Sequence, residues 1–203
     1  MERVQINAKN PQGRLIRRAA AVLANGGLIC YPTDTVYGVG CDIFDKKAIE
    51  RVYRLKAKGR RDPLSFICPN LQGIAQYAHV SDRAYRIMRR LLPGPYTVVL
   101  PATRLVPKMM MSNRKTVGIR VPDNLICHML LEEFGKPIVS TSASLPGGEI
   151  LHEPEEIAEV LAPYVHFFLD CGPLGLEPST VVDLTGDEPV VLRQGKGPVD
   201  LLY

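Results

Sequence analysis

Hydrophobic residues recur every three or four positions along several stretches of the chain, which is typical of helices with one buried face. Two of these stretches begin with a side chain that caps helices well, Asp45 in one and Ser81 in the other. A third ends at Gly135, a residue suited to the left-handed turn after a helix. The pattern predicts helices over residues 10–27, 45–56, 81–92, 124–135 and 154–163.

Short runs of β-branched and aromatic residues, bounded by proline or glycine, predict strands between and after these helices. The first run is buried in character and stops at Pro32. The predicted strands are residues 28–32, 64–68, 96–102, 116–123, 137–144, 166–170, 179–185 and 189–195. Helices and strands alternate early and strands crowd late, so we predict a single mixed α/β domain over residues 1–203.

Composition and charge narrow the class of protein without naming a ligand. The chain has 203 residues, 46% of them hydrophobic and 23% charged, as in folded soluble domains. A net charge of +4 permits an anionic ligand but does not by itself indicate a nucleic-acid-binding protein. No stretch has the length and apolarity of a membrane span and the first residues lack a signal-peptide core, so we predict a cytoplasmic location.

The cysteines and histidines show no spacing typical of a metal or disulfide site. The five cysteines form no C-x-x-C pair and mostly lie in apolar stretches, as reduced buried thiols do. The four histidines lack ligand spacing with the cysteines or with each other. We therefore predict free thiols and no metal ligands among the side chains.

Small hydroxylated residues cluster where predicted strands end. In "YPTDTVYGVG", residues 31–40, Thr33, Asp34 and Thr35 follow a strand, and Gly38 and Gly40 are expected to let the chain turn tightly. Such groups at the mouth of a cleft are placed to bind a ligand, because α/β sheets bind ligands at strand ends. The alternative is a turn in which the threonine and aspartate side chains satisfy only their own backbone.

A second cluster, "STSAS", places hydroxyls at Ser140, Thr141, Ser142 and Ser144. Hydroxyls donate readily to phosphate or carboxylate oxygens, and the sequence offers neither a G-x-S-x-G motif nor a suitably placed histidine for a serine hydrolase. A polar strand at the edge of the sheet is the alternative.

The basic run "LKAKGRRDPLSF", residues 55–66, has three interpretations: a phosphate-binding loop, an RNA contact or a solvated connection. Further cations and hydroxyls follow in "PSTVVDL" and "VLRQGKG". Together these residues suit a polyanionic ligand such as a nucleoside triphosphate. Neither a P-loop nor a dinucleotide-binding glycine motif is present.

Seven ordered blocks of the chain resemble the YrdC/Sua5 family of L-threonylcarbamoyladenylate synthases. They are "PTDTVYGVGCD", "KAKGRRDPL", "PGPYTVVL", "VGIRVPD", "STSAS", "PSTVVDL" and "VLRQG". The segments "TVGIRVP" and "LPGG" favour the YciO-like branch, and the end at Tyr203 resembles the form without a further C-terminal domain. The resemblance implies a twisted mixed sheet flanked by helices, with a concave, positively charged cavity.

The same resemblance implies a reaction. The family's enzymes combine L-threonine, bicarbonate and ATP, with Mg²⁺, to give threonylcarbamoyl-adenylate and pyrophosphate, and the product supplies the t6A modification of tRNA. By motif match, the catalytic residues are Lys56 and Lys58. The threonine-binding residues are Thr33, Thr35 and Ser142. The nucleotide-binding residues are Pro63, Leu64, Arg120, Ser140, Ser144, Ser179 and Arg193.

Two positions depart from the family pattern. Its K-x-R reads Lys56-Ala57-Lys58 here, which replaces a planar, bidentate guanidinium by a point charge, for which Arg60 or Arg61 is a candidate substitute. Its S-x-N reads Ser142-Ala143-Ser144, which replaces an amide by a shorter hydroxyl.

Two alternatives stay open beside the enzyme. One is a module of the same fold that binds double-stranded RNA or tRNA through the basic run, with residues 89–91 and 113–115 as further contacts. The other is a divergent paralogue that binds another anionic nucleotide.

Overall fold

The computed structural model describes residues 1–57, 64–145 and 147–202. These residues form one ten-stranded sheet in the order β1-β8-β2-β3-β7-β4-β6-β5-β9-β10. The strands are β1 Glu2–Gln5, β2 Ile29–Tyr31, β3 Gly38–Asp42, β4 Ser65–Ile67, β5 Tyr96–Pro101, β6 Thr116–Arg120, β7 Ile138–Ser142, β8 Phe167–Asp170, β9 Thr180–Asp183 and β10 Val190–Arg193. The α-helices are α1 Gly13–Ala24, α2 Lys46–Leu55, α3 Leu71–Tyr77, α4 Asp82–Leu91, α5 Leu125–Phe134 and α6 Pro154–Leu161.

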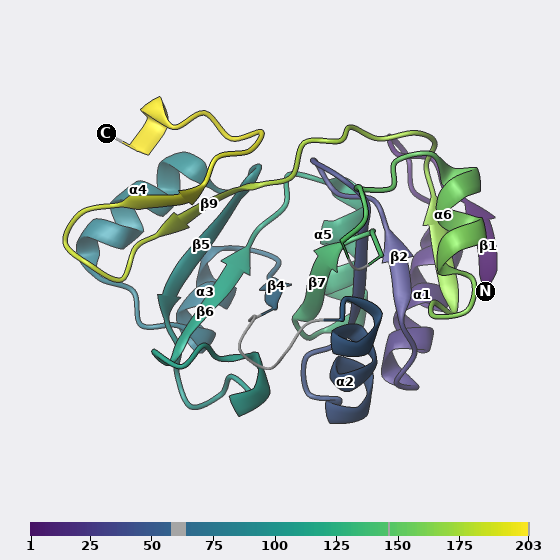
Figure 1. Cartoon of the computed structure of the whole chain (residues 1–203), viewed down its shortest axis with the longest axis horizontal. Coiled ribbons are helices and arrows are strands. Elements are labelled where there is room, and N and C mark those ends of the chain that lie inside the picture. Colours follow the sequence, from purple (N-terminus) through teal and green to yellow (C-terminus); the bar gives the residue numbers. More distant parts are fainter. Residues whose placement is uncertain (58–63, 146, 203) are drawn as a thin grey trace.

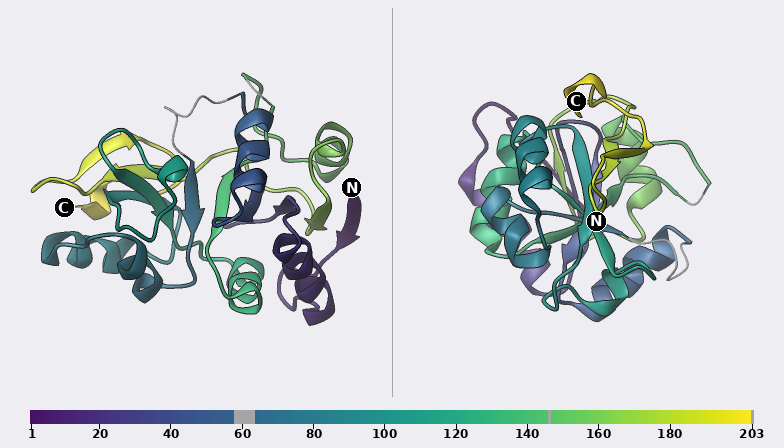
Figure 2. Two further views of the ribbon diagram at one scale, coloured as in Figure 1. Left: turned by 90° about the horizontal axis from the view of Figure 1, so that it is seen from below. Right: turned by 90° about the vertical axis from the view of Figure 1, so that its left-hand side faces the viewer.

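The sheet twists through the whole molecule and carries helices on both faces (Figures 1 and 2). Helices α1 and α5 pack together on one face, against Tyr31 and Ile138, while α2, α3, α4 and α6 share the buried cluster of the other face with Val39 and Val98. Two 3-10 helices, η1 Lys108–Met110 and η2 Asp200–Leu202, complete the described elements. The predicted mixed α/β class is confirmed.

The helix ends follow the chemistry expected of them. The Asp45 side chain accepts from the amide of Ala48 at 2.9 Å, and Ser81 Oγ accepts from the amide of Ala84 at 3.2 Å. Gly135 follows α5 with φ +73°, a left-handed conformation that only glycine adopts without a steric penalty. Every predicted helix is present, with its ends moved inward by at most three residues, and α6 starts at the predicted residue, Pro154.

Two strands and one α-helix were not predicted: β1, β3 and α3. Strand β1 lies at the edge of the sheet beside β8, so none of its side chains is fully buried and its sequence shows no apolar run. Helix α3 is seven residues long, less than two turns, which is too short for a helical period to stand out. Neither of these two residue patterns distinguishes its segment from a loop.

Strand β7 was open to interpretation as a polar edge strand, and that interpretation is wrong. It pairs with β3 on one side and β4 on the other, antiparallel to both. Its hydroxyls therefore lie near the middle of the sheet, where a polar side chain needs a partner or a ligand.

The tight turn expected at Gly38 and Gly40 is also wrong, because both glycines lie inside β3. The ring of Tyr31, on β2, occupies the space above them. A Cβ at Gly38 would lie 3.2 Å from Tyr31 Cζ, and a Cβ at Gly40 would lie 3.0 Å from Tyr31 Cε1. These glycines are needed for close packing rather than for a turn.

Replacing Gly40 with alanine is therefore expected to lower the free energy of unfolding by about 3 kcal/mol. The added Cβ would lie 2.4 Å from the Val139 carbonyl oxygen and 2.7 Å from Ile138 Cγ2, so backbone must move. Urea unfolding of the two proteins measures the difference. Gly186→Ala is the control, because nothing lies within 4 Å of a Cβ there; equal stability of the two variants would contradict the packing argument.

None of the helices in the described part of the chain combines the length and apolarity of a membrane span. The five cysteines are free, as predicted; four are buried and Cys171 is partly so. The cytoplasmic location stays a prediction.

Candidate functional site

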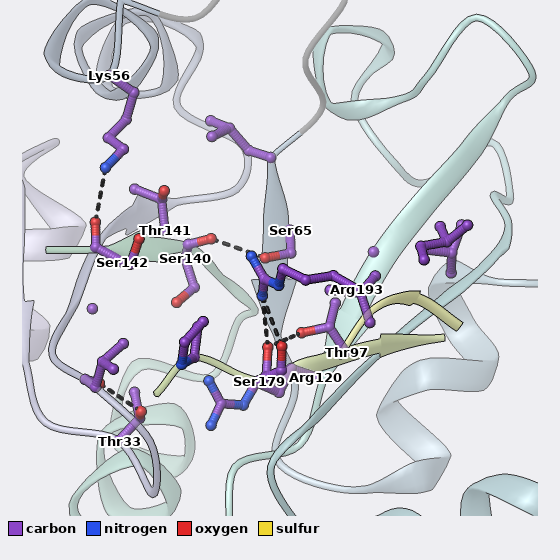
Figure 3. Close-up of a pocket in the computed structure, with 18 of the residues that line it drawn as sticks. Thr33, Lys56, Ser65, Thr97, Arg120, Ser140, Thr141, Ser142, Ser179 and Arg193 are labelled. Atoms are coloured by element: carbon purple, nitrogen blue, oxygen red, sulfur yellow. Dashed lines mark hydrogen bonds between the residues drawn. The ribbon is translucent and has the colours of Figure 1, made fainter. Parts of the chain in front are cut away.

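A cavity of about 480 Å³ opens over the middle strands of the sheet, on the face that also carries Tyr31 and Ile138 (Figure 3). Its floor is a row of small residues that neighbour one another across the strands. Ser140 of β7 pairs with Ser65 of β4, and Ser65 pairs with Gly118 of β6. Because large side chains are missing from this row, the twisted sheet leaves a hollow there.

The cavity wall is rich in hydroxyls and cations. Its polar and charged side chains are Thr33, Lys56, Ser65, Thr97, Thr116, Arg120, Ser140, Thr141, Ser142, Ser179 and Arg193. Among the described residues that line it, none is acidic. Valines 99 and 181, with Leu192, add an apolar portion beside β5, β9 and β10. This combination favours an anionic ligand that also carries an apolar or aromatic part.

The Thr33–Thr35 segment forms a turn and also contributes to the cavity. Thr33 Oγ1 donates to the Val36 carbonyl at 2.6 Å and accepts from the Thr35 amide at 3.1 Å. The turn in which side chains bond only to nearby backbone, the alternative to ligand binding, is therefore present. It is not the whole account, because Arg120 Nη2 donates to Thr35 Oγ1 at 2.8 Å and Thr33 lines the cavity.

Arg120 also forms a buried ion pair with Asp34. The two side chains are only 10% and 11% exposed. Within the described part of the chain, Arg120 Nε and Asp34 Oδ2 have no hydrogen-bond partner. A buried pair with unused donors and acceptors has capacity for a further polar partner, since such groups are costly to leave unmatched.

Arg193 supplies a second guanidinium, from the end of β10. It donates to the Ser179 carbonyl at 2.8 Å, and Ser179 Oγ lies 2.8 Å from Thr97 Oγ1. Partial burial, followed by the charge of Arg120, lowers the pKa of Arg193 from its ordinary value. The contribution of Arg120 is a repulsion between two guanidinium charges. An anion bound between them would relieve that repulsion.

Lys56 enters from the end of α2, opposite Arg193 (Figure 3). Its Nζ donates to the carbonyl of Ser142 at 3.2 Å, to the carbonyl of Ser144 at 3.0 Å and to Ser144 Oγ. An ammonium donates three hydrogens and accepts none, so these three acceptors fix the position of Nζ. Lys56 is thus held at the cavity wall.

The structure brings most of the predicted site residues together. Those that line the cavity are Thr33, Lys56, Leu64, Arg120, Ser140, Ser142, Ser179 and Arg193. Thr35 and Ser144 are buried behind the lining, where they contact Arg120 and Lys56. Lys58 and Pro63, with Arg60 and Arg61, lie outside the described residues. The role of each residue stays a prediction.

Sequence reasoning missed Ser65, Thr97 and Thr116 as wall residues, whereas Thr141 belonged to the predicted hydroxyl cluster. The first three lie on strands β4, β5 and β6, and each stood inside or beside a block of apolar residues that predicted a strand. A hydroxyl within such a block was the available signal. It does not identify the cavity, because the sequence does not show which strands are neighbours.

The described residues contain no group of three or more histidine, cysteine, aspartate or glutamate side chains that could hold a metal ion. Asp34, the carboxylate nearest the Thr33 end, is already paired with Arg120. Mg²⁺ stays a prediction.

Comparison with known proteins identifies the family. A family model described as "Telomere recombination", which covers Sua5, YciO and YrdC, matches residues 21–195. The chain belongs to this Sua5/YciO/YrdC family. The uncharacterised protein YciO of Escherichia coli K12 is 43% identical over 196 residues, which cover 96% of this chain and 95% of YciO. The crystal structure of E. coli YciO superimposes with a TM-score of 0.95 over the whole of both chains, at 41% identity.

The Sua5/YciO/YrdC family also contains enzymes. The threonylcarbamoyl-AMP synthase of Pyrococcus abyssi is 32% identical over 188 residues, which cover 91% of this chain but 55% of that protein. The crystal structure of P. abyssi Sua5 complexed with L-threonine has a TM-score of 0.92, at 30% identity, and covers 98% of this chain and 59% of that one. The resemblance drawn from the seven blocks is confirmed at the level of the family and of the YciO-like branch.

The RNA-binding alternative stays a prediction. Residues 58–61 of its basic run are outside the described part. Of its other candidate residues, Arg89 and Arg114 are exposed, and neither is part of the cavity wall.

Proposed function

We propose that this protein is a threonylcarbamoyl-AMP synthase that uses the cavity between Lys56, Arg120 and Arg193. The observation that carries the proposal is the convergence of three cations and a set of hydroxyls on one hollow whose described lining has no acidic residue. The names of the P. abyssi relatives support the substrates, since one is a threonylcarbamoyl-AMP synthase and another was crystallised with L-threonine.

The reaction requires two anions to approach each other. The threonine amine and bicarbonate give a carbamate and water, and one carbamate oxygen attacks the α-phosphorus of ATP. The new phosphorus–oxygen bond forms as the bond to the β-phosphate bridging oxygen breaks, and pyrophosphate leaves. Catalysis of such a step is chiefly positioning and neutralisation of charge, which fixed cations and hydroxyl donors supply.

We assign the two substrates to different ends of the cavity. Arg120 donates to Thr35 Oγ1, and Arg120 and Thr33 both line the cavity, so this end holds the amino acid, with its carboxylate beside the Arg120 guanidinium. Arg193, Ser179 and the apolar portion form the nucleotide end. Lys56 lies at the β7 wall, opposite Arg193, and neutralises charge on the phosphates.

Incubation with ATP, Mg²⁺, bicarbonate and labelled L-threonine tests the proposal directly. We expect pyrophosphate and a labelled threonylcarbamoyl-adenylate in equal amounts, and neither product when threonine or bicarbonate is omitted. The α,β-methylene analogue of ATP is the control, since it occupies the site but cannot release pyrophosphate. Formation of neither product from ATP, with a folded protein, would refute the assignment.

A further inference from the structure

Tyr31 lies outside the cavity, yet its side chain reaches toward the wall. It belongs to β2, and Gly38 is its partner on β3. The side chain is fully buried, and its ring lies over Gly38 and Gly40, where added Cβ atoms would come within 3.2 and 3.0 Å of it. The ring therefore crosses β3 and brings its hydroxyl to β7.

That hydroxyl donates to Ser140 Oγ at 2.8 Å. Burial raises the pKa of Tyr31 well above its ordinary value, so the phenol keeps its proton and acts as the donor. Ser140 Oγ receives this hydrogen, has no other hydrogen-bond partner among the described residues, and lines the cavity. One hydrogen of its own remains to be donated.

We propose that Tyr31 is a positioning residue for the anion-binding site, which fixes the Ser140 hydroxyl as a donor to an anionic oxygen in the cavity. A free serine hydroxyl rotates and either donates or accepts; one that already accepts a buried phenol hydrogen presents its own hydrogen. The glycines of β3 leave room for the ring that makes this contact. The inference rests on the proposed function only in taking the ligand to be a phosphate-bearing anion.

A double-mutant cycle tests whether Tyr31 affects anion binding through Ser140. Binding of ATP and of pyrophosphate is measured by calorimetry for the wild type, Tyr31→Phe, Ser140→Ala and the double variant. We expect about tenfold weaker binding for Ser140→Ala and about fivefold for Tyr31→Phe, because hydrogen bonds to charged groups are stronger than neutral ones. The double variant should bind within about twofold of Ser140→Ala, because Tyr31 acts only through that hydroxyl.

Tyr96→Phe is the matched control. It removes a buried hydroxyl that donates at 2.8 Å to the Pro198 carbonyl, and Tyr96 does not line the cavity. Melting temperatures of the two phenylalanine variants should fall alike, while only Tyr31→Phe loses affinity. Should Tyr31→Phe fail to fold, Gly38→Ala serves instead, since its Cβ would lie 3.3 Å from Ser140 Oγ and 3.4 Å from Tyr31 Oη and so push the two apart.

Four results would each overturn the inference. The affinity losses of Tyr31→Phe and Ser140→Ala could add in the double variant, Tyr31→Phe could bind as tightly as the wild type, Tyr96→Phe could lose as much affinity as Tyr31→Phe, or the wild type could bind neither ATP nor pyrophosphate. If the wild type binds pyrophosphate and the cycle shows coupling, but no threonylcarbamoyl-adenylate forms, the proposed function fails and the role of Tyr31 stands.

Discussion

Replacing Lys56 with alanine is expected to lower kcat/KM for threonylcarbamoyl-AMP formation by about 10²–10³-fold, the usual effect of removing one preorganised group that stabilises developing charge. The ammonium is held by two carbonyls and a hydroxyl at the end of β7, so its charge is already in place before substrate binds. Pyrophosphate release, followed at several ATP concentrations, separates the effect on kcat from that on KM.

Lys47→Ala is the matched control for this prediction. Lys47 belongs to the same helix, α2, and is exposed, and the substitution removes the same charge. It should leave kcat/KM within about twofold of the wild-type value. An equal loss in both variants would indicate a long-range effect of charge rather than a positioned group, and a Lys56→Ala protein with full activity would exclude Lys56 from the mechanism.

The contact between Lys56 and Ser144 changes the meaning of one departure from the family pattern. Ser144 stands where the pattern has asparagine, and the substitution was expected to alter the nucleotide contact. The structure places Ser144 behind the cavity wall, where its hydroxyl and carbonyl both accept from Lys56. The shorter side chain therefore acts on the position of the lysine. The other departure, at Lys58, lies outside the described residues.

The fold was largely predictable because its main elements carry local signals. Asp45 and Ser81 cap their helices, Gly135 ends one, and the apolar runs form strands. The wrong predictions share one cause: the structure of these segments depends on contacts between residues far apart in the sequence. Gly38 and Gly40 are typical of a turn when considered alone. They belong to a strand that pairs with β2 and β7, and they are glycines because the Tyr31 ring occupies the space above them.

The candidate site was predictable in part for a similar reason. The hydroxyls and cations at strand ends stood out by composition, and the family pattern grouped them. Ser65 and Thr97 did not stand out, because each follows or precedes apolar residues in a strand. Only the pairing of β4 with β7 and β6, and of β6 with β5, brings these side chains to one hollow. Strand order is a property of the whole chain.

The two arginines of the cavity are expected to respond oppositely when each is replaced by methionine. Arg193→Met should leave the melting temperature unchanged or raise it slightly, because the variant removes a cation whose pKa is lowered by partial burial and by Arg120. Arg120→Met should lower the melting temperature by about 10 °C, because it leaves Asp34 buried without its ion-pair partner, a change that costs about 3–5 kcal/mol.

Both variants should nevertheless lose function. Arg193→Met is expected to weaken ATP binding by about 10²-fold, the value of a charge-assisted contact to phosphate, while Arg120→Met should chiefly weaken threonine binding. Scanning calorimetry gives the melting temperatures and titration calorimetry the affinities. The double variant Arg120→Met with Asp34→Asn is the decisive control: it should recover most of the lost stability and none of the threonine affinity.

This combination separates a binding role from a structural one. A purely structural Arg120 would regain threonine affinity along with stability once Asp34 is neutralised. An Arg193→Met protein that loses stability would mean that its bond to the Ser179 carbonyl outweighs the repulsion from Arg120. In the expected result, the cavity holds one guanidinium that the fold needs and one that it tolerates, and the second is retained for the anion it binds.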